Sequence, residues 1–183
     1  MRQPCLPGLL ALCTLIAGCF DNNRNTTLPE SGLQTITSAG LQRNYYLDLP
    51  SDYDPDAAPR PLIIGYHGTG GSHQAWLDDY RLREVVGDGA ILVYPDALPN
   101  AANINQWDFA NDFQMFEDLL ERLPAQLNFD ASRIFITGHS SGGGFAHELG
   151  CRYGDRIRGI APVAGSLTAT SCIGAVAVLQ IQG

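Results

Sequence analysis

The chain has 183 residues, and its hydrophobic content of 45% is enough for the core of one domain. The formal net charge is −8, and all eleven basic residues are arginines. A chain without lysine can use neither a Schiff-base lysine nor a P-loop lysine. An acidic chain without a basic run is also a poor nucleic-acid binder, so we expect no nucleic-acid partner.

Residues 1–18 have the pattern of a signal peptide of the lipoprotein type. Arg2 supplies the positive start, and the apolar run Leu6–Ala17 is too short to cross a bilayer as a mature helix. The small residues before Cys19 resemble the lipobox of bacterial lipoproteins, in which cleavage leaves the cysteine as the lipidated first residue. The alternative is an ordinary secretory signal. In either case we expect export, as a secreted protein or as a periplasmic or outer-surface lipoprotein whose only membrane contact is the lipid on Cys19.

The cysteines fall into two groups. Cys5 and Cys13 belong to the signal segment and Cys19 is the expected lipidation site, which leaves Cys151 and Cys172. An even pair in an oxidising compartment can form a disulfide, although two separate buried thiols would also explain it. The sequence has no C-x-x-C motif and no histidine cluster, so we expect no metal site.

The mature chain begins with a polar stretch and a hairpin. Residues 19–31 are rich in Asn and Thr and predict a flexible tether. Leu33–Ser38 and Arg43–Leu49 alternate between apolar and polar residues around a small turn, which predicts a β-hairpin. Pro50–Pro61 contains four prolines and three aspartates, so it is expected to be a loop.

The remainder, within a domain at 32–183, alternates apolar runs with helical patterns. We expect buried strands at Pro61–Tyr66, Ala90–Tyr94, Ile134–Thr137, Ile157–Val163 and Ala175–Ile181. The helices are expected from Ser72 to about Val86, at Asp112–Leu123, and after Ser140 to about Tyr153. This alternation predicts an α/β fold with a mostly parallel sheet and right-handed crossovers. Sites in such sheets gather at the C-terminal ends of the strands.

One of these strand ends carries a nucleophile motif. Gly138–Gly142 reads G-H-S-S-G and fits G-x-S-x-G, a sharp turn that lifts a serine hydroxyl to the edge of a sheet. Glycines are needed on both sides because side chains there would collide with the packed strand and helix. Ser140 is therefore the candidate nucleophile. The alternative is a glycine-rich loop that closes an ordinary βα unit.

A second glycine-rich segment, His67–Gly71, follows the strand at Pro61–Tyr66. Its backbone could supply one donor for an oxyanion, from Gly68 or Thr69, while the N–H of Ser141 supplies the other. A plain turn is the alternative for this segment. In a later loop, Trp107 is a candidate for lining an acyl or aromatic pocket, or else it packs on the core.

Four motifs together carry a family resemblance: Gly68–Gly71, Tyr94–Asp96, Thr137–Gly143 and Ile160–Gly165. They resemble the secreted esterases grouped with polyhydroxybutyrate depolymerases and feruloyl or acetylxylan esterases, from roughly Thr35 onward. The resemblance implies an α/β-hydrolase fold with helices on both faces of the sheet. It also implies hydrolysis of polyester or plant-cell-wall esters through an acyl-serine intermediate, without metal or cofactor.

The chain departs from that family at its end. In the proteins of that family, the strand that resembles Ala175–Gly183 continues into a turn with the catalytic Asp, and the catalytic His lies further on. The sequence given ends at Gly183, so we expect an incomplete hydrolase domain that lacks the triad Asp and His and turns over little substrate. The residues present are not expected to replace them: His67, His73, Asp96, His139 and His147.

Two other functions remain open from the sequence. The motif around Ser140 does not select the acyl group, so a serine peptidase or a lactone hydrolase would use the same residues. A surface lipoprotein that keeps the hydrolase scaffold without catalysis is the non-enzymatic alternative.

Overall fold

The computed structural model describes residues 29–182. The expected signal peptide, Cys19 and most of the expected tether therefore lie outside the described residues. Within the described part of the chain, no helix is long and apolar enough to cross a membrane.

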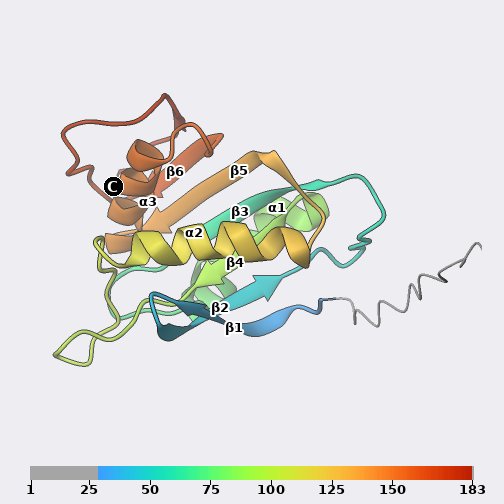
Figure 1. Cartoon of the computed structure of the whole chain (residues 1–183), viewed down its shortest axis with the longest axis horizontal. Coiled ribbons are helices and arrows are strands. Elements are labelled where there is room, and N and C mark those ends of the chain that lie inside the picture. The colour runs from blue at the N-terminus through green and yellow to red at the C-terminus, as the bar shows by residue number, and fades with distance from the viewer. Residues whose placement is uncertain (1–28, 183) are drawn as a thin grey trace, which may run out of the picture.

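The described chain forms one seven-stranded sheet in the order β1-β2-β4-β3-β5-β6-β7. Figure 1 labels the strands from β1 to β6. The first two strands are antiparallel to each other and β2 is antiparallel to β4, whereas all other neighbours are parallel. The strands are β1 (Gly32–Ser38), β2 (Leu41–Asp48), β3 (Arg60–Tyr66), β4 (Ile91–Pro95), β5 (Phe129–His139), β6 (Gly159–Val163) and β7 (Ala177–Val178).

Helices cover both faces of this sheet. The longer ones, α2 (Asp112–Arg122) and α3 (Ser141–Arg152), lie on one face, and α1 (Leu82–Val86) lies on the other (Figure 1). Strand β4 shows the two-sided burial: Ile91 and Val93 belong to the larger core cluster, while Leu92 and Tyr94 belong to the smaller one. Short 3-10 turns at Gly87–Gly89 and Leu123–Ala125 complete the helical segments.

The predicted hairpin is formed by β1 and β2. Its two turn residues, Ala39 and Gly40, have φ values of 48° and 76°. Positive φ at both central residues gives the twist that matches two antiparallel strands. A buried ion pair then fixes the hairpin to the rest of the fold, because Arg43 Nη1 lies 2.6 Å from Asp112 Oδ1 on α2.

The single helix expected from Ser72 to about Val86 was wrong. The segment consists of a π-helical turn at Trp76–Tyr80 and the short helix α1, separated by Arg81 with φ of 52°. The cause is tertiary packing. A Cβ on Gly65 would lie 2.8 Å from Trp76 Cε2, so the indole rests directly on the strand and fixes the first turn. The reversal at Arg81 then lets Leu82 and Val86 pack on the smaller core cluster.

The last strand is shorter than expected. The apolar run Ala175–Ile181 forms only the two-residue strand β7 and one further bridge between Val163 and Ile181. Pro162 lies in the middle of the facing stretch of β6. Because proline has no N–H to donate, the ladder is interrupted opposite it.

Candidate active site

Ser140 stands at the junction where β5 ends and α3 begins, and its side chain is exposed. Its backbone has φ of 54° and ψ of −119°, a conformation that costs a non-glycine residue about 1–3 kcal/mol. Two hydrogen bonds hold it there. The Ser140 N–H donates to Val163 O at 2.9 Å, and the Gly144 N–H donates to Ser140 O at 3.0 Å. The serine is thus held at a tight bend by its own backbone.

The glycines of the G-x-S-x-G turn permit a very close approach of backbones. A Cβ on Gly138 would lie 2.1 Å from Gly142 O, and a Cβ on Gly142 would lie 2.1 Å from Tyr66 O. These contacts are with backbone atoms, which cannot swing aside as a side chain can. The collision that the motif predicts is therefore present on both sides of Ser140.

The segment after β3 lies against this turn. A Cβ on Gly68 would be 3.4 Å from Ser140 Cβ and 3.3 Å from His139 Nδ1. The C-terminal ends of β3 and β5 meet because the two strands are parallel neighbours. The structure therefore brings Gly68 close to Ser140 and Ser141, although about 70 residues separate them in the sequence.

His67 orients the peptide between Gly68 and Thr69. Its buried ring receives a hydrogen bond at Nε2 from the Ala97 N–H at 3.0 Å, so Nδ1 carries the proton and donates to Gly68 O at 2.7 Å. Gly71 N–H donates to the same oxygen at 3.0 Å. In a trans peptide the N–H points opposite to the C=O. The Thr69 N–H therefore faces away from these bonds, and it has no hydrogen-bond acceptor within residues 29–182.

The N-terminus of α3 supplies the second donor group. The N–H of Ser141 belongs to the first helical turn, whose amides have no acceptor within the helix. The partial positive charge of a helix N-terminus favours a negatively charged oxygen beside it. The Ser141 hydroxyl itself is buried without a hydrogen-bond partner among the described residues, so its backbone is the part available for chemistry.

All four histidines are hydrogen-bonded to groups other than Ser140. His73 Nδ1 lies 2.8 Å from Asp96 Oδ2, and the backbone N–H of His73 donates to Asp96 Oδ1 at 2.6 Å. His139 Nδ1 lies 2.9 Å from the Tyr80 hydroxyl, and His147 bonds to the side chain of Gln180. Burial lowers the pKa of His67, which stays neutral between its two backbone partners. Within residues 29–182, no histidine is therefore hydrogen-bonded to Ser140.

Of the two alternatives for Trp107, the structure has the one in which it packs on the core and not the one in which it lines a substrate pocket. Its side chain is only 5% exposed, and it stacks on Phe145 with ring centroids 5.5 Å apart. The indole N–H donates to His67 O at 2.7 Å. Trp107 therefore supports the backbone of the 67–71 segment from inside the core. His67 and Trp107 are the supporting residues that sequence reasoning missed, since no motif marks a buried ring that bonds to a backbone.

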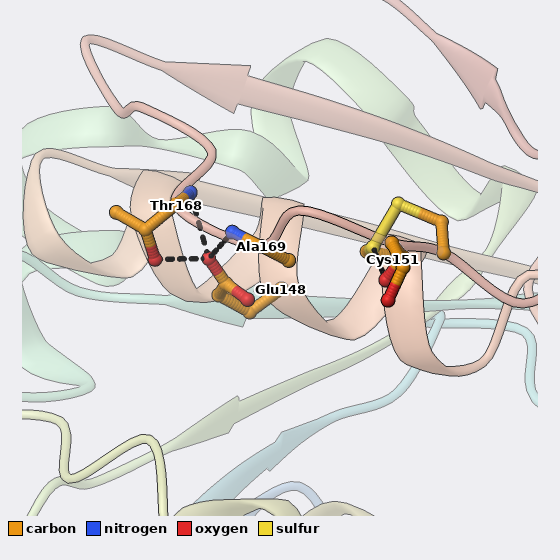
Figure 2. The surroundings of a disulfide bond; sticks show 6 residues. Glu148, Cys151, Thr168 and Ala169 are labelled. Carbon is orange, nitrogen blue, oxygen red and sulfur yellow. Dashed lines mark hydrogen bonds between the residues drawn. A yellow bond between two sulfur atoms is a disulfide. The ribbon is translucent and has the colours of Figure 1, made fainter.

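The structure pairs Cys151 with Cys172 in a disulfide that closes a sequence separation of 21 residues (Figure 2). Of the two sequence alternatives for these cysteines, it therefore has the disulfide. Among the described residues, no group of three or more His, Cys, Asp or Glu side chains could hold a metal ion.

Comparisons with known proteins agree with this geometry. No family model matches the sequence. The chain is 32% identical to a probable feruloyl esterase C of Aspergillus niger over an alignment of 196 residues. The alignment covers 96% of this chain and 66% of that protein. It is 29% identical to a feruloyl esterase D of Neurospora crassa over 82% of this chain and 53% of that protein. The chain thus spans between about half and two thirds of the length of these curated relatives.

Solved structures show the same fold. A ferulic acid esterase superposes with a TM-score of 0.61 at 20% identity, over 77% of this chain and 61% of the other. An S-formylglutathione hydrolase of Staphylococcus aureus superposes with a TM-score of 0.58 at 17% identity, over 75% of this chain and 57% of the other. The predicted fold and esterase group are confirmed. The chain belongs to the α/β-hydrolase esterase group that includes the feruloyl esterases.

Proposed function

We propose that Ser140 is the nucleophile of a serine carboxylic-ester hydrolase. The observation that carries the proposal is the exposed Ser140 at positive φ, in contact with Gly68 and followed by the free amides of α3. Because the relatives are named feruloyl esterases, the first candidate substrates for this chain are plant-cell-wall esters of an aromatic acid. Polyesters are the other candidate class. The substrate is thus a small or polymeric ester.

In the first step, Ser140 Oγ attacks the ester carbonyl carbon and loses its proton to a base. The carbonyl oxygen becomes an oxyanion, which accepts hydrogen bonds from the N–H of Ser141 and from that of Thr69 or Gly68. Each such donor contributes about 3 kcal/mol to stabilising the transition state. The intermediate then expels the alcohol and leaves an acyl group on Ser140, and water releases the acid in a second step. Neither step uses a metal or a cofactor.

Residues 29–182 hold the nucleophile and the oxyanion donors of this mechanism, whereas the four histidines have other partners. In serine hydrolases that lack a working triad, the oxyanion hole and substrate binding still leave a residual acceleration of about 10³–10⁴ over water. We therefore propose that the 183-residue chain turns over esters slowly. We also propose that an external base accelerates the reaction at Ser140.

The test measures hydrolysis of p-nitrophenyl acetate and methyl ferulate by the whole chain, with and without added imidazole. Ser140→Ala measures the background that imidazole produces alone. Ser132→Ala, at the opposite end of β5, is the matched serine control. We expect imidazole-stimulated hydrolysis and an acetyl group on Ser140 by mass spectrometry in all but Ser140→Ala. Equal rates for the wild type and Ser140→Ala would refute the esterase proposal.

A non-catalytic binding protein is the second candidate, and one observation favours it, namely that no histidine among the described residues is bonded to Ser140. It predicts that the chain binds an aromatic ester without hydrolysing it, whether or not imidazole is present. Calorimetric titration with methyl ferulate, followed by mass analysis of the ester, separates the two candidates.

We also propose that the chain is exported and that Cys19 carries a lipid. The support is the apolar run and the small residues before Cys19 in the sequence. Metabolic labelling with a radioactive fatty acid should mark the wild type but not Cys19→Ala. Equal labelling of both would refute the lipid anchor, and retention of the chain in the cytoplasm would refute export.

A further inference from the structure

The loop between β6 and β7, residues 164–176, starts close to Ser140 and contains Cys172 of the disulfide. It starts beside the first turn of α3, where a Cβ on Gly165 would lie 2.2 Å from the carbonyl carbon of Gly143. Just before it, Val163 O accepts the hydrogen bond from the Ser140 N–H. The beginning of the loop and the bend at Ser140 therefore share one small volume of packed backbone.

Glu148 holds the middle of this loop. Its side chain is 9% exposed, and Oε1 accepts hydrogen bonds from the Thr168 N–H at 2.8 Å and the Ala169 N–H at 2.9 Å. The Thr168 hydroxyl donates to the same oxygen, as Figure 2 shows. A largely buried carboxylate requires such partners, because an unpaired charge at this depth is costly. Residue 148 therefore needs a side-chain oxygen that can accept these hydrogen bonds.

The disulfide holds the far end of the loop. Cys172 bonds to Cys151, and the Ile173 N–H donates to Cys151 O at 2.7 Å. Glu148 and Cys151 are three residues apart, so they lie on the same face of α3. At the other end of the loop, the side chains of Gln180 and Gln182 donate to Gly165 O at 3.3 and 3.2 Å. Between these two ends, Glu148 is the side chain that holds Thr168 and Ala169.

We propose that Glu148 is a positioning residue for Ser140. By holding Thr168 and Ala169 against α3, it keeps Gly165 seated on Gly143 and keeps Val163 O in place for the Ser140 N–H. The functional part of the inference rests on the proposed role of Ser140 as the nucleophile. The positioning part depends only on the backbone contacts.

Hydrogen exchange of the whole chain tests the positioning part. In Glu148→Ala we expect exchange to become at least about tenfold faster in the peptides that contain residues 164–169 and 138–144. Glu148→Gln keeps a carbonyl oxygen that can accept the same bonds, and we expect it to restore most of the protection. Tyr153→Phe is the control, since it removes a hydrogen bond from Tyr153 to Glu117 near the end of α3 without touching the loop. Should Glu148→Ala fail to fold, Thr168→Val removes one donor alone and is expected to give a smaller change in the same direction.

The imidazole-assisted acylation of Ser140 tests the functional part. We expect Glu148→Ala to be acylated roughly tenfold more slowly at saturating substrate, because a small misplacement of a reacting group has a large kinetic effect. Glu148→Gln and Tyr153→Phe should stay close to the wild type. Unchanged exchange at residues 138–144 in Glu148→Ala would overturn the positioning part, and faster exchange with unchanged acylation would overturn the functional part. A wild type that is not acylated at Ser140 would instead refute the proposed function, and the exchange data would still decide the positioning.

Discussion

A Cβ atom on Gly68 would lie 3.4 Å from Cβ of Ser140 and 3.3 Å from Nδ1 of His139, so a methyl group on residue 68 would press lightly on the bend at Ser140. We predict that Gly68→Ala lowers the rate of Ser140 acylation about tenfold by shifting the oxyanion donors, because such displacements strongly affect rates. Its stability to urea should change by less than about 1 kcal/mol, since a shift of a few tenths of an ångström relieves the contact. An unchanged acylation rate would contradict the placement of the oxyanion donors beside Ser140.

Gly142→Ala is expected to behave differently from Gly68→Ala. A Cβ here would lie 2.1 Å from Tyr66 O, a backbone atom at the C-terminal end of β3. Overpacking of this kind costs about 1–3 kcal/mol or more, so we predict a clear loss of unfolding free energy in urea titrations. Gly89→Ala is the control, because its nearest neighbour would be a side-chain atom at 3.9 Å. A Gly142→Ala protein as stable as Gly89→Ala would contradict the packing described here.

The fold was predictable from local patterns. Apolar runs marked the central strands because strands buried on both faces need no polar alternation. The sharp turn at Ser140 was predictable because the two glycines that it requires lie within five residues, between an apolar run and a helical pattern. The fold and the esterase group therefore followed from short segments alone.

Other features depend on contacts between distant segments, which no local pattern contains. The break at Arg81 follows from the packing of Trp76 on Gly65, and the periodicity of the segment gives no sign of it. The sequence left two positions open for Trp107 because a loop tryptophan can line a pocket or pack on the core. Only the tertiary structure shows that its indole bonds to His67 O.

His67 should make the stability of the protein depend on pH. Burial lowers its pKa in the folded state, whereas the unfolded chain protonates it near the ordinary value of about 6.5. Below that value the unfolded state binds more protons. The stability that neutral His67 contributes is therefore complete above pH ~6.5 and is lost as the pH falls toward the lowered folded pKa. A protonated ring would also set an N–H against the Ala97 N–H.

The measurement is the urea midpoint between pH 7.5 and pH 5. We predict that the midpoint of the wild type falls with pH over this range and that His67→Gln reduces the slope. His147→Gln retains His67 and should follow the wild type. Identical slopes for His67→Gln and the wild type would show that His67 does not contribute to the acid sensitivity.

The disulfide between Cys151 and Cys172 should contribute to stability mainly by restricting the unfolded chain. For the separation of 21 residues, loop-closure entropy gives about 3 kcal/mol. We predict that replacing both cysteines with serine lowers the unfolding free energy by about this amount. Dithiothreitol should destabilise the wild type equally and leave the double variant unchanged. Resistance of the wild type to the reductant, at full reduction by thiol counting, would contradict the prediction.

The positive φ of 54° at Ser140 lowers the stability of the fold in the same conformation that exposes the hydroxyl. Glycine adopts this conformation without strain, whereas alanine does not. Ser140→Gly should therefore melt at a higher temperature than Ser140→Ala, by an amount equivalent to about 1 kcal/mol, although both lack the hydroxyl. Equal melting temperatures would indicate that this backbone is relaxed. If Ser140→Gly melts at the higher temperature, glycine is the better inert replacement for trapping an intact ester in crystals, because it removes the hydroxyl and the backbone strain together.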